Sequence, residues 1–301
     1  MIQFALSLPS TGPIMSEVAQ QIYPVSTLYV VATPIGNIAD ISLRALHVLS
    51  IVDAIACEDT RNTAHLLTRY GLQKSLIAAH EHNEREVADK IISRLQSGER
   101  IALVSDAGTP AVSDPGARIV EAVRLAGLRV MPLPGACAAV SALSASGLVN
   151  DTFYFGGFLP TKSAQRDAAL AKLRGITATL VFYEAPHRIA ETANALAAAF
   201  EPTRQIVFAR ELTKLFEEIH RCPASDAAAW IAADAHREKG EFVILIEGAP
   251  AATDGDAIEA DRILTILLAE CSVKQAAGLA AQITGQKKNA LYTRALQMKA
   301  E

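Results

Sequence analysis

The chain has 301 residues, of which half are hydrophobic and a fifth are charged, so it is long enough for two domains with substantial cores. Its formal net charge of −4 excludes a protein that is basic overall, and any contact with nucleic acid must therefore come from local basic patches. The four cysteines are far apart and form no CxxC pair, which argues against a zinc site or a disulfide framework. No apolar run reaches the length of a membrane span. We expect a soluble, cytoplasmic protein that does not bind a membrane.

The first 26 residues contain no Lys or Arg, which fits a secretory signal poorly. We expect residues 1–26 to form a loose extension, and the sequence leaves open whether translation begins at Met15. From Thr27 onward, short apolar runs alternate with segments whose apolar residues recur at helical spacing. This alternation predicts an N-terminal α/β domain over residues 27–136 with a parallel sheet. Its strands are expected at 28–32, 54–57, 76–79, 101–104 and 128–133.

The loop SDAGTPAVSDPG, residues 105–116, joins the fourth of these strands to a helix. Its Gly and Pro residues preset the backbone for close approach to a ligand, at the sheet edge where ligands of open α/β sheets bind. It lacks the lysine of a phosphate-binding P-loop and the spacing of a dinucleotide fingerprint. Asp106 and Asp114 favour a ligand with hydroxyls or a cationic group. The alternative is that they are turn and cap residues, with Asp114 capping the following helix.

The pattern changes after residue 136 and predicts a second α/β domain over residues 137–248, with strands at 153–158, 179–183, 205–209 and 241–246. Residues 249–257 have the composition of a linker. Residues 258–301 predict three short helices that resemble a helix-turn-helix in outline. Residues 272–300 contain five basic residues and no acidic one. This stretch is a candidate RNA contact, although a solvated basic face on a helical cap is the commoner explanation.

Eight motifs in a fixed order carry a family resemblance: TPIGN, EDTR, HEHNE, SDAGTPAVSDPG, PGACAAVSALSASG, FYEAPHR, ARELTK and KGEFV. Together they resemble the ribosomal RNA small subunit methyltransferase I family of the tetrapyrrole methylase superfamily. The resemblance implies two α/β domains with a cofactor cleft between them, and a homodimer. It implies an S-adenosyl-L-methionine-dependent enzyme that methylates the ribose 2′-oxygen of cytidine 1402 in 16S rRNA, within the small ribosomal subunit. Residues 1–26 lie outside the resemblance, and Arg221-Cys222-Pro223 departs from a glycine expected after ARELTK.

We expect Asp106 to accept hydrogen bonds from the ribose or the ammonium group of the cofactor, with Phe182, Tyr183 and Leu212 as apolar contacts for the adenine. The remaining predicted cofactor residues follow the strands of the first domain: Pro34, Ile35, Gly36, Ala107, Gly108, Ser113, Asp114, Pro134, Gly135 and Ala136.

The candidates for proton removal and substrate placement are Glu58, Asp59, Arg61, His80, Glu81, Asn83, Glu84 and Lys214. The sequence does not choose among them. Asn83 and Glu86 fit a helix-capping box, and Glu58 or Asp59 fits an ion pair with Arg61. His80 and His82 beside Glu81 are residue types that could bind a metal, but no third or fourth ligand is evident at motif spacing, so we expect no metal.

The cationic candidates for phosphate contacts in the domains are Arg61, Arg188, Arg210 and Lys214, because guanidinium and ammonium groups bind phosphate by charge-assisted hydrogen bonds. In the tail they are Lys274, Lys287, Lys288, Arg294 and Lys299. Two other functions remain open: a small-molecule methyltransferase acting on a macrocyclic tetrapyrrole, and a non-catalytic RNA-binding factor that keeps a cofactor pocket. The basic tail favours RNA over a macrocycle.

Overall fold

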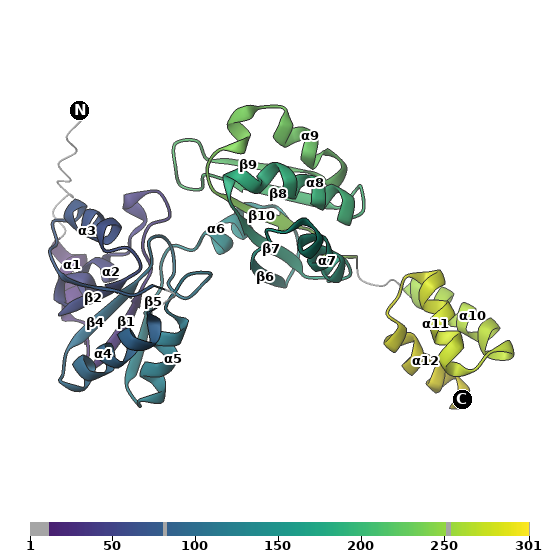
Figure 1. The fold of residues 1–301 in the computed structure, drawn as a ribbon, viewed down its shortest axis with the longest axis horizontal. Helices are drawn as coiled ribbons and strands as arrows, with labels where there is room; N and C mark the ends of the chain where they lie inside the picture. Colours follow the sequence, from purple (N-terminus) through teal and green to yellow (C-terminus); the bar gives the residue numbers. More distant parts are fainter. Residues whose placement is uncertain (1–11, 81–82, 251–253, 301) are drawn as a thin grey trace. The chain divides into compact units, whose positions relative to one another are not determined.

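The computed structural model of this protein describes residues 12–80, 83–250 and 254–300. The chain divides into two compact units, Met1–Glu247 and Gly248–Glu301. The first unit contains two five-stranded sheets, and the second is helical (Figure 1). Within the described ranges, no helix has the length and apolar character needed to cross a bilayer.

The first sheet is parallel throughout, with the strand order β3-β2-β4-β1-β5. The inner strands are buried along nearly their whole length, as is typical of a parallel sheet covered by helices on each side. Their bounds are β1 (Thr27–Val31), β2 (Ala54–Cys57), β3 (Ser75–Ala78), β4 (Arg100–Val104) and β5 (Arg129–Leu133). All five carboxyl ends meet at one edge, so the loops that follow them are brought together there.

Side-chain alternation along these strands builds a core on each face of the sheet. Tyr29 belongs to the cluster that includes Val48 of α2 (Leu43–Ile51) and Leu67 of α3 (Thr60–Arg69). Leu28 belongs to the other cluster, with side chains of α4 (Glu84–Gln96) and α5 (Ala117–Leu125). Both residues are fully buried. Burial of such side chains stabilises the fold by about 1.5–3 kcal/mol each, so the two faces form a large core. A short 3-10 helix, η1 (Ile38–Asp40), precedes α2.

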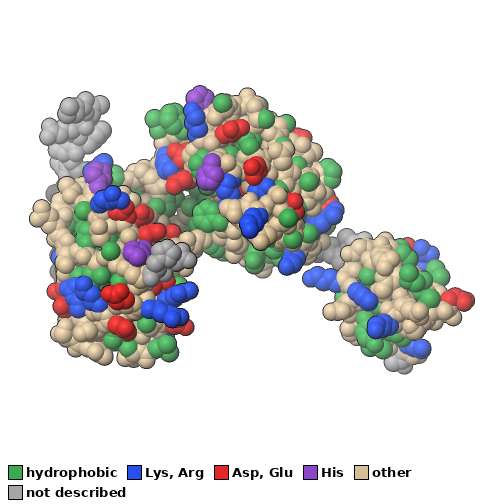
Figure 2. Space-filling view, viewed as in Figure 1, with side chains coloured by type: hydrophobic (Ala, Val, Ile, Leu, Met, Phe, Trp, Pro, Cys, Tyr) green, Lys and Arg blue, Asp and Glu red, His purple; other side chains and the backbone are tan. Residues whose placement is uncertain are grey.

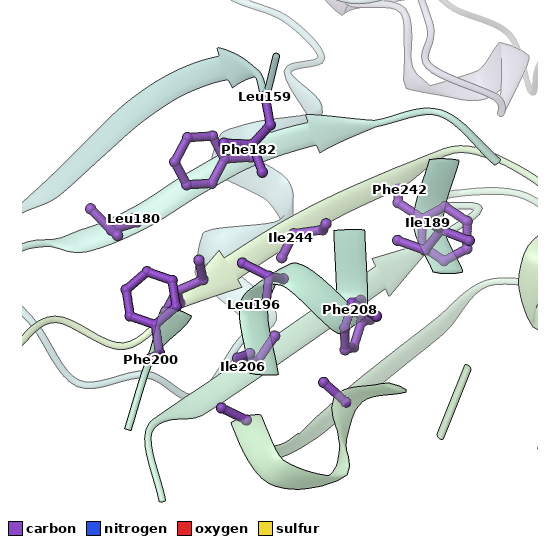
Figure 3. Close-up of a cluster of buried hydrophobic side chains, with 14 of the residues drawn as sticks. Leu159, Leu180, Phe182, Ile189, Leu196, Phe200, Ile206, Phe208, Phe242 and Ile244 are labelled. Atoms are coloured by element: carbon purple, nitrogen blue, oxygen red, sulfur yellow. The ribbon is translucent and has the colours of Figure 1, made fainter. Parts of the chain in front are cut away.

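The second sheet is mixed, with the order β6-β7-β10-β8-β9 and a parallel pair only between β6 and β7. One face packs on α6 (Ala138–Ala145) through Val181, Val207 and Val243. The other carries the cluster of Phe182, Phe208 and Ile244 under the remaining helices (Figure 3). The strands are β6 (Phe153–Phe158), β7 (Thr179–Glu184), β8 (Gln205–Arg210), β9 (Glu218–Pro223) and β10 (Phe242–Ile246). The helices are α7 (Ser163–Leu173), η2 (Pro186–Arg188), α8 (Ile189–Ala199), η3 (Ala224–Asp226), α9 (Ala227–Ala232) and η4 (Ala235–Glu238).

The second unit consists of α10 (Asp254–Glu270), α11 (Val273–Thr284) and α12 (Lys288–Ala300) around a small core that includes Leu264 and Leu291. Ser272 and Gln275 form a capping box at the start of α11, and Gly285 ends that helix in the left-handed conformation. The turn between α11 and α12 is therefore fixed by local sequence. Helix α10 begins at Asp254, inside the stretch expected to be a linker.

A helix near the N-terminus and an edge strand are among the elements not expected from the sequence. Helix α1 (Gly12–Gln20) lies in the predicted loose extension, where Val18 and the following Tyr23 are buried. The rest of that extension up to residue 11 lies outside the described residues. Strand β9 pairs antiparallel with β8 at the edge of the second sheet. In its sequence, EIHRCP, apolar and polar residues alternate only weakly, and there is a proline, which is tolerated at a sheet edge. For these reasons the hydrophobic pattern does not indicate the strand.

Two predicted helix caps are wrong. Helix α5 begins after Gly116, which has φ of 123°, so Asp114 lies two residues too early to cap it. Asn83 precedes α4, but its side chain makes no capping bond. It accepts from the backbone N–H of His80 at 2.8 Å and donates to the Ala78 carbonyl at 3.0 Å, which closes the turn after β3. The capping box with Glu86 is therefore not formed.

Candidate active site

A cavity of about 310 Å³ lies where loops at the carboxyl edge of the first sheet meet one face of the second. Its volume is at the lower end of the range for small-molecule sites. Loops of the first sheet contribute Ile35, Ala107, Gly108, Thr109, Val112, Ser113 and Asp114. The later residues are Cys137, Ala138, Phe158, Tyr183, Glu184, Ala185, Pro186, Ala209, Leu212, Lys214, Glu241, Phe242 and Val243.

The loop over residues 105–116 is held in place by backbone contacts. Thr33 and Gly108 exchange two backbone hydrogen bonds of 2.8 and 3.0 Å, and the Thr109 hydroxyl donates to the Ala136 carbonyl at 2.9 Å. Ala111 and Ser113 have φ of 66° and 64°, a left-handed conformation that is costly for residues with a Cβ. Such strain persists only where surrounding contacts impose it, and it is concentrated at functional sites. The loop is therefore a pre-shaped wall of the cavity.

Aromatic side chains form another wall. The ring of Tyr183 packs edge-on against Phe155 and Phe158, with centroid separations of 5.0 and 5.8 Å. The Tyr183 hydroxyl accepts a hydrogen bond from the backbone N–H of Ala139 at 3.3 Å, and burial raises its pKa to about 12. Phe182, the residue before it in β7, points to the opposite face of the sheet (Figure 3). The predicted adenine contact by Phe182 is therefore wrong for this cavity, whereas Tyr183 and Leu212 line it.

Lys214 reaches the cavity from the loop after β8. Its Nζ lies 2.8 Å from a carboxylate oxygen of Glu211 and 2.8 Å from one of Glu241. Desolvation acts to lower the pKa of Lys214, but the hydrogen bonds to the two carboxylates outweigh it and raise the pKa. The amine is therefore protonated at neutral pH. A group with this charge suits an anionic or hydroxyl ligand and does not suit proton removal.

Gly36 and Asn37 fit closely against that same loop. The Asn37 N–H donates to the Thr213 hydroxyl at 3.1 Å, and a Cβ on Gly36 would lie 2.9 Å from that oxygen. Only glycine fits here without displacing Thr213 or Lys214. Gly36 therefore contributes to the site by contact with a lining residue and does not itself line the cavity.

Three carboxylates gather at the carboxyl edge of the first sheet. Burial, together with the negative charges of Glu58 and Asp106, raises the pKa of Asp114 to about 6. Burial, followed by the charges of Asp106 and Asp59, also raises the pKa of Glu58. Asp106 is exposed and lies outside the lining. It accepts hydrogen bonds from the Asp59 N–H at 3.2 Å and the Asn62 side chain at 2.8 Å, so it ties β4 to the start of α3.

Other predicted catalytic residues lie on the same edge but away from the cavity. Arg61, whose side chain is 89% exposed, pairs with Asp59 at 3.0 Å, while Asp59 also caps α3. Glu84 is buried and accepts from the Gly116 N–H at 2.5 Å, which assigns it to the start of α5. Asn83 closes the turn that contains His80. Glu81 lies outside the described residues.

Two predicted phosphate-binding residues are used internally. Arg188 donates to the carbonyls of Leu159 and Pro160 at 2.6 and 3.3 Å, and its Nε lies 3.2 Å from Glu184. Arg210 donates to the carbonyls of His236 and Lys239 at 3.2 and 3.3 Å. Each side chain is only 12% exposed. Neither guanidinium is available to bind RNA, and both predictions are corrected.

The basic residues of the tail are placed differently. Lys274, Lys287, Lys288 and Lys299 are exposed on the second unit, and Figure 2 shows Lys and Arg side chains spread over its visible face. Arg294 is paired with Asp261 through two hydrogen bonds of 2.8 and 2.5 Å. The four lysines are therefore the better candidates for contact with phosphate.

Half of the cofactor residues predicted from the sequence line the cavity. Of the predicted cofactor residues, those at the cavity are Ile35, Ala107, Gly108, Ser113, Asp114, Tyr183 and Leu212. Those outside the lining are Pro34, Gly36, Asp106, Pro134, Gly135, Ala136 and Phe182. Several lining residues were not predicted, among them Val112, Cys137, Phe158, Glu184 and Glu241. Glu184 and Glu241 belong to the motifs FYEAPHR and KGEFV, which could have indicated them. In the described parts of the chain, no cluster of His, Cys, Asp or Glu is arranged to hold a metal ion.

Comparison with known proteins identifies the family. The sequence profile of the Tetrapyrrole (Corrin/Porphyrin) Methylases matches residues 27–228, and that of the RsmI C-terminal HTH domain matches residues 254–299. The chain is 50% identical over 270 residues to Ribosomal RNA small subunit methyltransferase I of Escherichia coli O157:H7, covering 90% of this chain and 94% of the relative. This chain belongs to that methyltransferase family, within the tetrapyrrole methylases.

Two further comparisons agree with this assignment. The Pseudomonas aeruginosa relative of the same name is 50% identical over 273 residues, covering 90% of this chain and 97% of its own length. The crystal structure of uroporphyrin-III-C-methyltransferase from Thermus thermophilus aligns with a TM-score of 0.53 at 19% identity, covering 74% of this chain and 94% of that one. That similarity supports the fold. The predicted family and fold class are confirmed, and so is S-adenosyl-L-methionine as the cofactor of this methyltransferase.

The cavity fits this cofactor chemically. S-adenosyl-L-methionine supplies an electrophilic methyl group on a sulfonium sulfur, next to an adenine, a ribose and an amino-acid end. Tyr183, Phe158 and Leu212 offer the apolar and aromatic contacts that suit adenine and a sulfonium cation. The carboxylate of Glu241 and the backbone around Gly108 offer polar partners for hydroxyl and ammonium groups. These residues would hold the cofactor.

Proposed function

We propose that this protein methylates the 2′-oxygen of a cytidine ribose in 16S rRNA, using S-adenosyl-L-methionine. The single observation that carries the proposal is 50% identity, over nine-tenths of the chain, to enzymes named for the methylation of small-subunit rRNA. The oxygen as acceptor and the cytidine as target come from the motif resemblance and are part of the proposal. We further propose that the reaction takes place in the cytoplasm, on rRNA within the small subunit.

The site chemistry supports an enzyme that acts mainly by alignment. The methyl donor already carries a good leaving group, so orientation of the hydroxyl against it can supply much of the rate enhancement, about 7–11 kcal/mol in ideal cases. The pre-shaped loop around Gly108 and the packed ring of Tyr183 are rigid parts suited to that task. Lys214, held charged by Glu211 and Glu241, is suited to orient a polar group of either reactant.

The second unit supports RNA as the substrate. Lys274, Lys287, Lys288 and Lys299 give it exposed positive charge in a chain whose net charge is −4. Such local charge provides the salt-dependent affinity for phosphates that RNA binding requires. A macrocyclic substrate has no need of it, which is why RNA is preferred here.

We also propose that the protein is a homodimer. Strand β6 lies at the open edge of the second sheet, and its Phe153 and Tyr154 are 49% and 44% exposed. Val149, shortly before this strand, is fully exposed. An apolar surface beside an unpaired strand edge is typical of an interface. Sedimentation at micromolar concentration should give twice the chain mass, and Phe153→Asp should reduce it to one chain; a monomeric parent protein would refute the proposal.

Methyl transfer from labelled S-adenosyl-L-methionine tests the function directly. Assembled small subunits that lack the modification, free 16S rRNA and a uroporphyrinogen-type macrocycle are offered separately to the full-length protein. We expect label in the rRNA of the subunits and none in the macrocycle. Label in the macrocycle alone would refute the proposal in favour of a small-molecule methyltransferase. RNA binding without any transfer would favour a non-catalytic factor.

A further inference from the structure

The ionisable side chains at the cavity are Asp114, Cys137, Tyr183, Glu184, Lys214 and Glu241. Lys214 and Glu241 are paired with each other at 2.8 Å. The Tyr183 hydroxyl accepts from the Ala139 N–H and shares a hydrogen bond with the Cys137 thiol.

The carboxylate of Glu184 is also bound to other groups of the protein. One carboxylate oxygen accepts from the Ala185 N–H at 2.8 Å and lies 3.2 Å from Arg188. The other accepts from the Thr192 hydroxyl at 2.7 Å, and the side chain is fully buried. Both oxygens of Glu184 are therefore occupied by partners within the protein, which leaves little room for contact with a substrate hydroxyl.

Asp114 differs from these groups. Within the described ranges, no Lys, Arg or His forms an ion pair with it. The charged groups that act on it are acidic: Glu58 at the end of β2 and Asp106 in its own loop. Ser105 donates a hydrogen bond to its carboxylate, and Tyr183 faces it from the second sheet. Asp114 is thus an ionisable carboxylate at the cavity with spare capacity to accept a proton.

We propose that Asp114 is the catalytic residue that accepts the proton of the attacking ribose hydroxyl, an inference that rests on the proposed function. The O–H bond breaks and its proton passes to a carboxylate oxygen of Asp114. The electron pair of the hydroxyl oxygen forms the new bond to the methyl carbon, and the electron pair of the broken carbon–sulfur bond stays on sulfur. Asp114 ends protonated and returns its proton to solvent before the next turnover.

The basicity of Asp114 suits this role. A general base works best when its pKa lies near the working pH. Burial, aided by Glu58 and Asp106, brings the pKa of Asp114 to about 6. At pH 7 to 8 the carboxylate is therefore mostly ionised and is a stronger base than an ordinary aspartate. The strained residues Ala111 and Ser113 fix its backbone beside the cavity.

The test compares Asp114→Asn with Asp89→Asn, a matched change at an exposed position on α4. Single-turnover methyl transfer to small subunits is measured with saturating cofactor, and cofactor affinity is measured by calorimetry. We expect Asp114→Asn to lower the transfer rate at least about 100-fold while the Kd for S-adenosyl-L-methionine changes less than about threefold. Asp89→Asn should match the parent in both. Parent-like transfer by Asp114→Asn, or loss of cofactor binding together with transfer, would overturn the inference.

The pH dependence of the unmodified protein keeps the inference testable if the variant does not fold. Single-turnover transfer should fall below pH 6, following one protonation with an apparent pKa of about 6. A flat rate down to pH 5, with the protein still folded and the cofactor bound, would overturn the role of Asp114. Absence of ribose methylation by the parent protein at every pH would instead refute the proposed function.

Discussion

The buried carboxylate of Glu84, the first residue of α4, accepts the backbone N–H of Gly116 at the start of α5 at 2.5 Å. A single side chain thereby links the loop after β3 to the end of the 105–116 loop. Arg118 in the first turn of α5 lies 3.8 Å from the same carboxylate. Glu84 therefore anchors the far end of the loop that carries Asp114.

Removal of this anchor should destabilise the first unit. Glu84→Ala leaves a buried N–H without a partner and should lower the free energy of unfolding by about 1–3 kcal/mol. Glu84→Gln keeps an acceptor and should cost less than half as much. Glu86→Ala, at an exposed position on the same helix, serves as the control and should change stability by less than about 0.5 kcal/mol. Urea unfolding measures all three, and equal effects of Glu84→Ala and Glu86→Ala would contradict the assignment.

Gly240 lies against the pair that holds Lys214. Its φ of 88° is strained for other residues, and a Cβ there would lie 2.6 Å from Glu211 Oε1. Gly71 has a similar φ of 71° but open space around it. Gly71→Ala should therefore show the backbone penalty alone, about 1–2 kcal/mol. Gly240→Ala should cost clearly more and should also weaken cofactor binding, because Glu211 must move away from Lys214. If both substitutions lowered the free energy of unfolding by the same amount, the close approach of Gly240 to Glu211 would not limit the residue type at this position.

The raised pKa of Asp114 makes stability depend on pH. An acid whose folded pKa of about 6 exceeds its ordinary value of 3.8 destabilises the fold above pH 6, and this cost disappears as the pH falls below the lower value. Asp114→Asn removes the cost, so we expect it to be more stable than the parent at pH 8 by about 1 kcal/mol, after discounting for solvent screening of a half-buried group. The gain should fade by pH 4. A variant less stable than the parent at pH 8 would show that the native carboxylate is favoured.

The strands were predictable because buried apolar runs bounded by turn residues carry a clear signal. Strands β2 and β6 occupy the predicted residues, and most others differ by one residue at an end. The roles of single polar side chains were less predictable, because they depend on partners distant in sequence. Arg188 is committed to carbonyls of Leu159 and Pro160, which no local pattern indicates.

At the cavity, too, the position of the loop was predictable but the roles of its polar side chains were not. The 105–116 loop was predicted at the correct edge of the sheet, yet Asp106 and Asp114 separate within it. Asp106 is exposed and bonded to Asn62, while Asp114 lines the cavity beyond the left-handed residues Ala111 and Ser113. Backbone reversals at non-glycine residues have no reliable sequence signal. The choice between the two aspartates therefore required the structure.

The lysines of the second unit should set the salt dependence of RNA binding. Lys287→Ala with Lys288→Ala should weaken binding to the small subunit and flatten the log–log slope of affinity against salt by about one to two units. The Kd for the cofactor should stay unchanged. An equal double change at exposed Lys90 and Lys172 of the first unit provides the control. A parent-like slope in the Lys287 and Lys288 variant would assign this face to a structural role.

The most direct test of the central claim is nucleoside analysis of the methylated product. Small subunits from cells that lack this protein are incubated with it and S-adenosyl-L-methionine, and the 16S rRNA is digested to nucleosides and fragments for mass spectrometry. We predict that one cytidine of the decoding region gains a single methyl group on its ribose. The same fragment should stay unmodified when the protein or the cofactor is omitted. A methyl group found on a base, or no gain in rRNA while a macrocycle is methylated, would contradict the account.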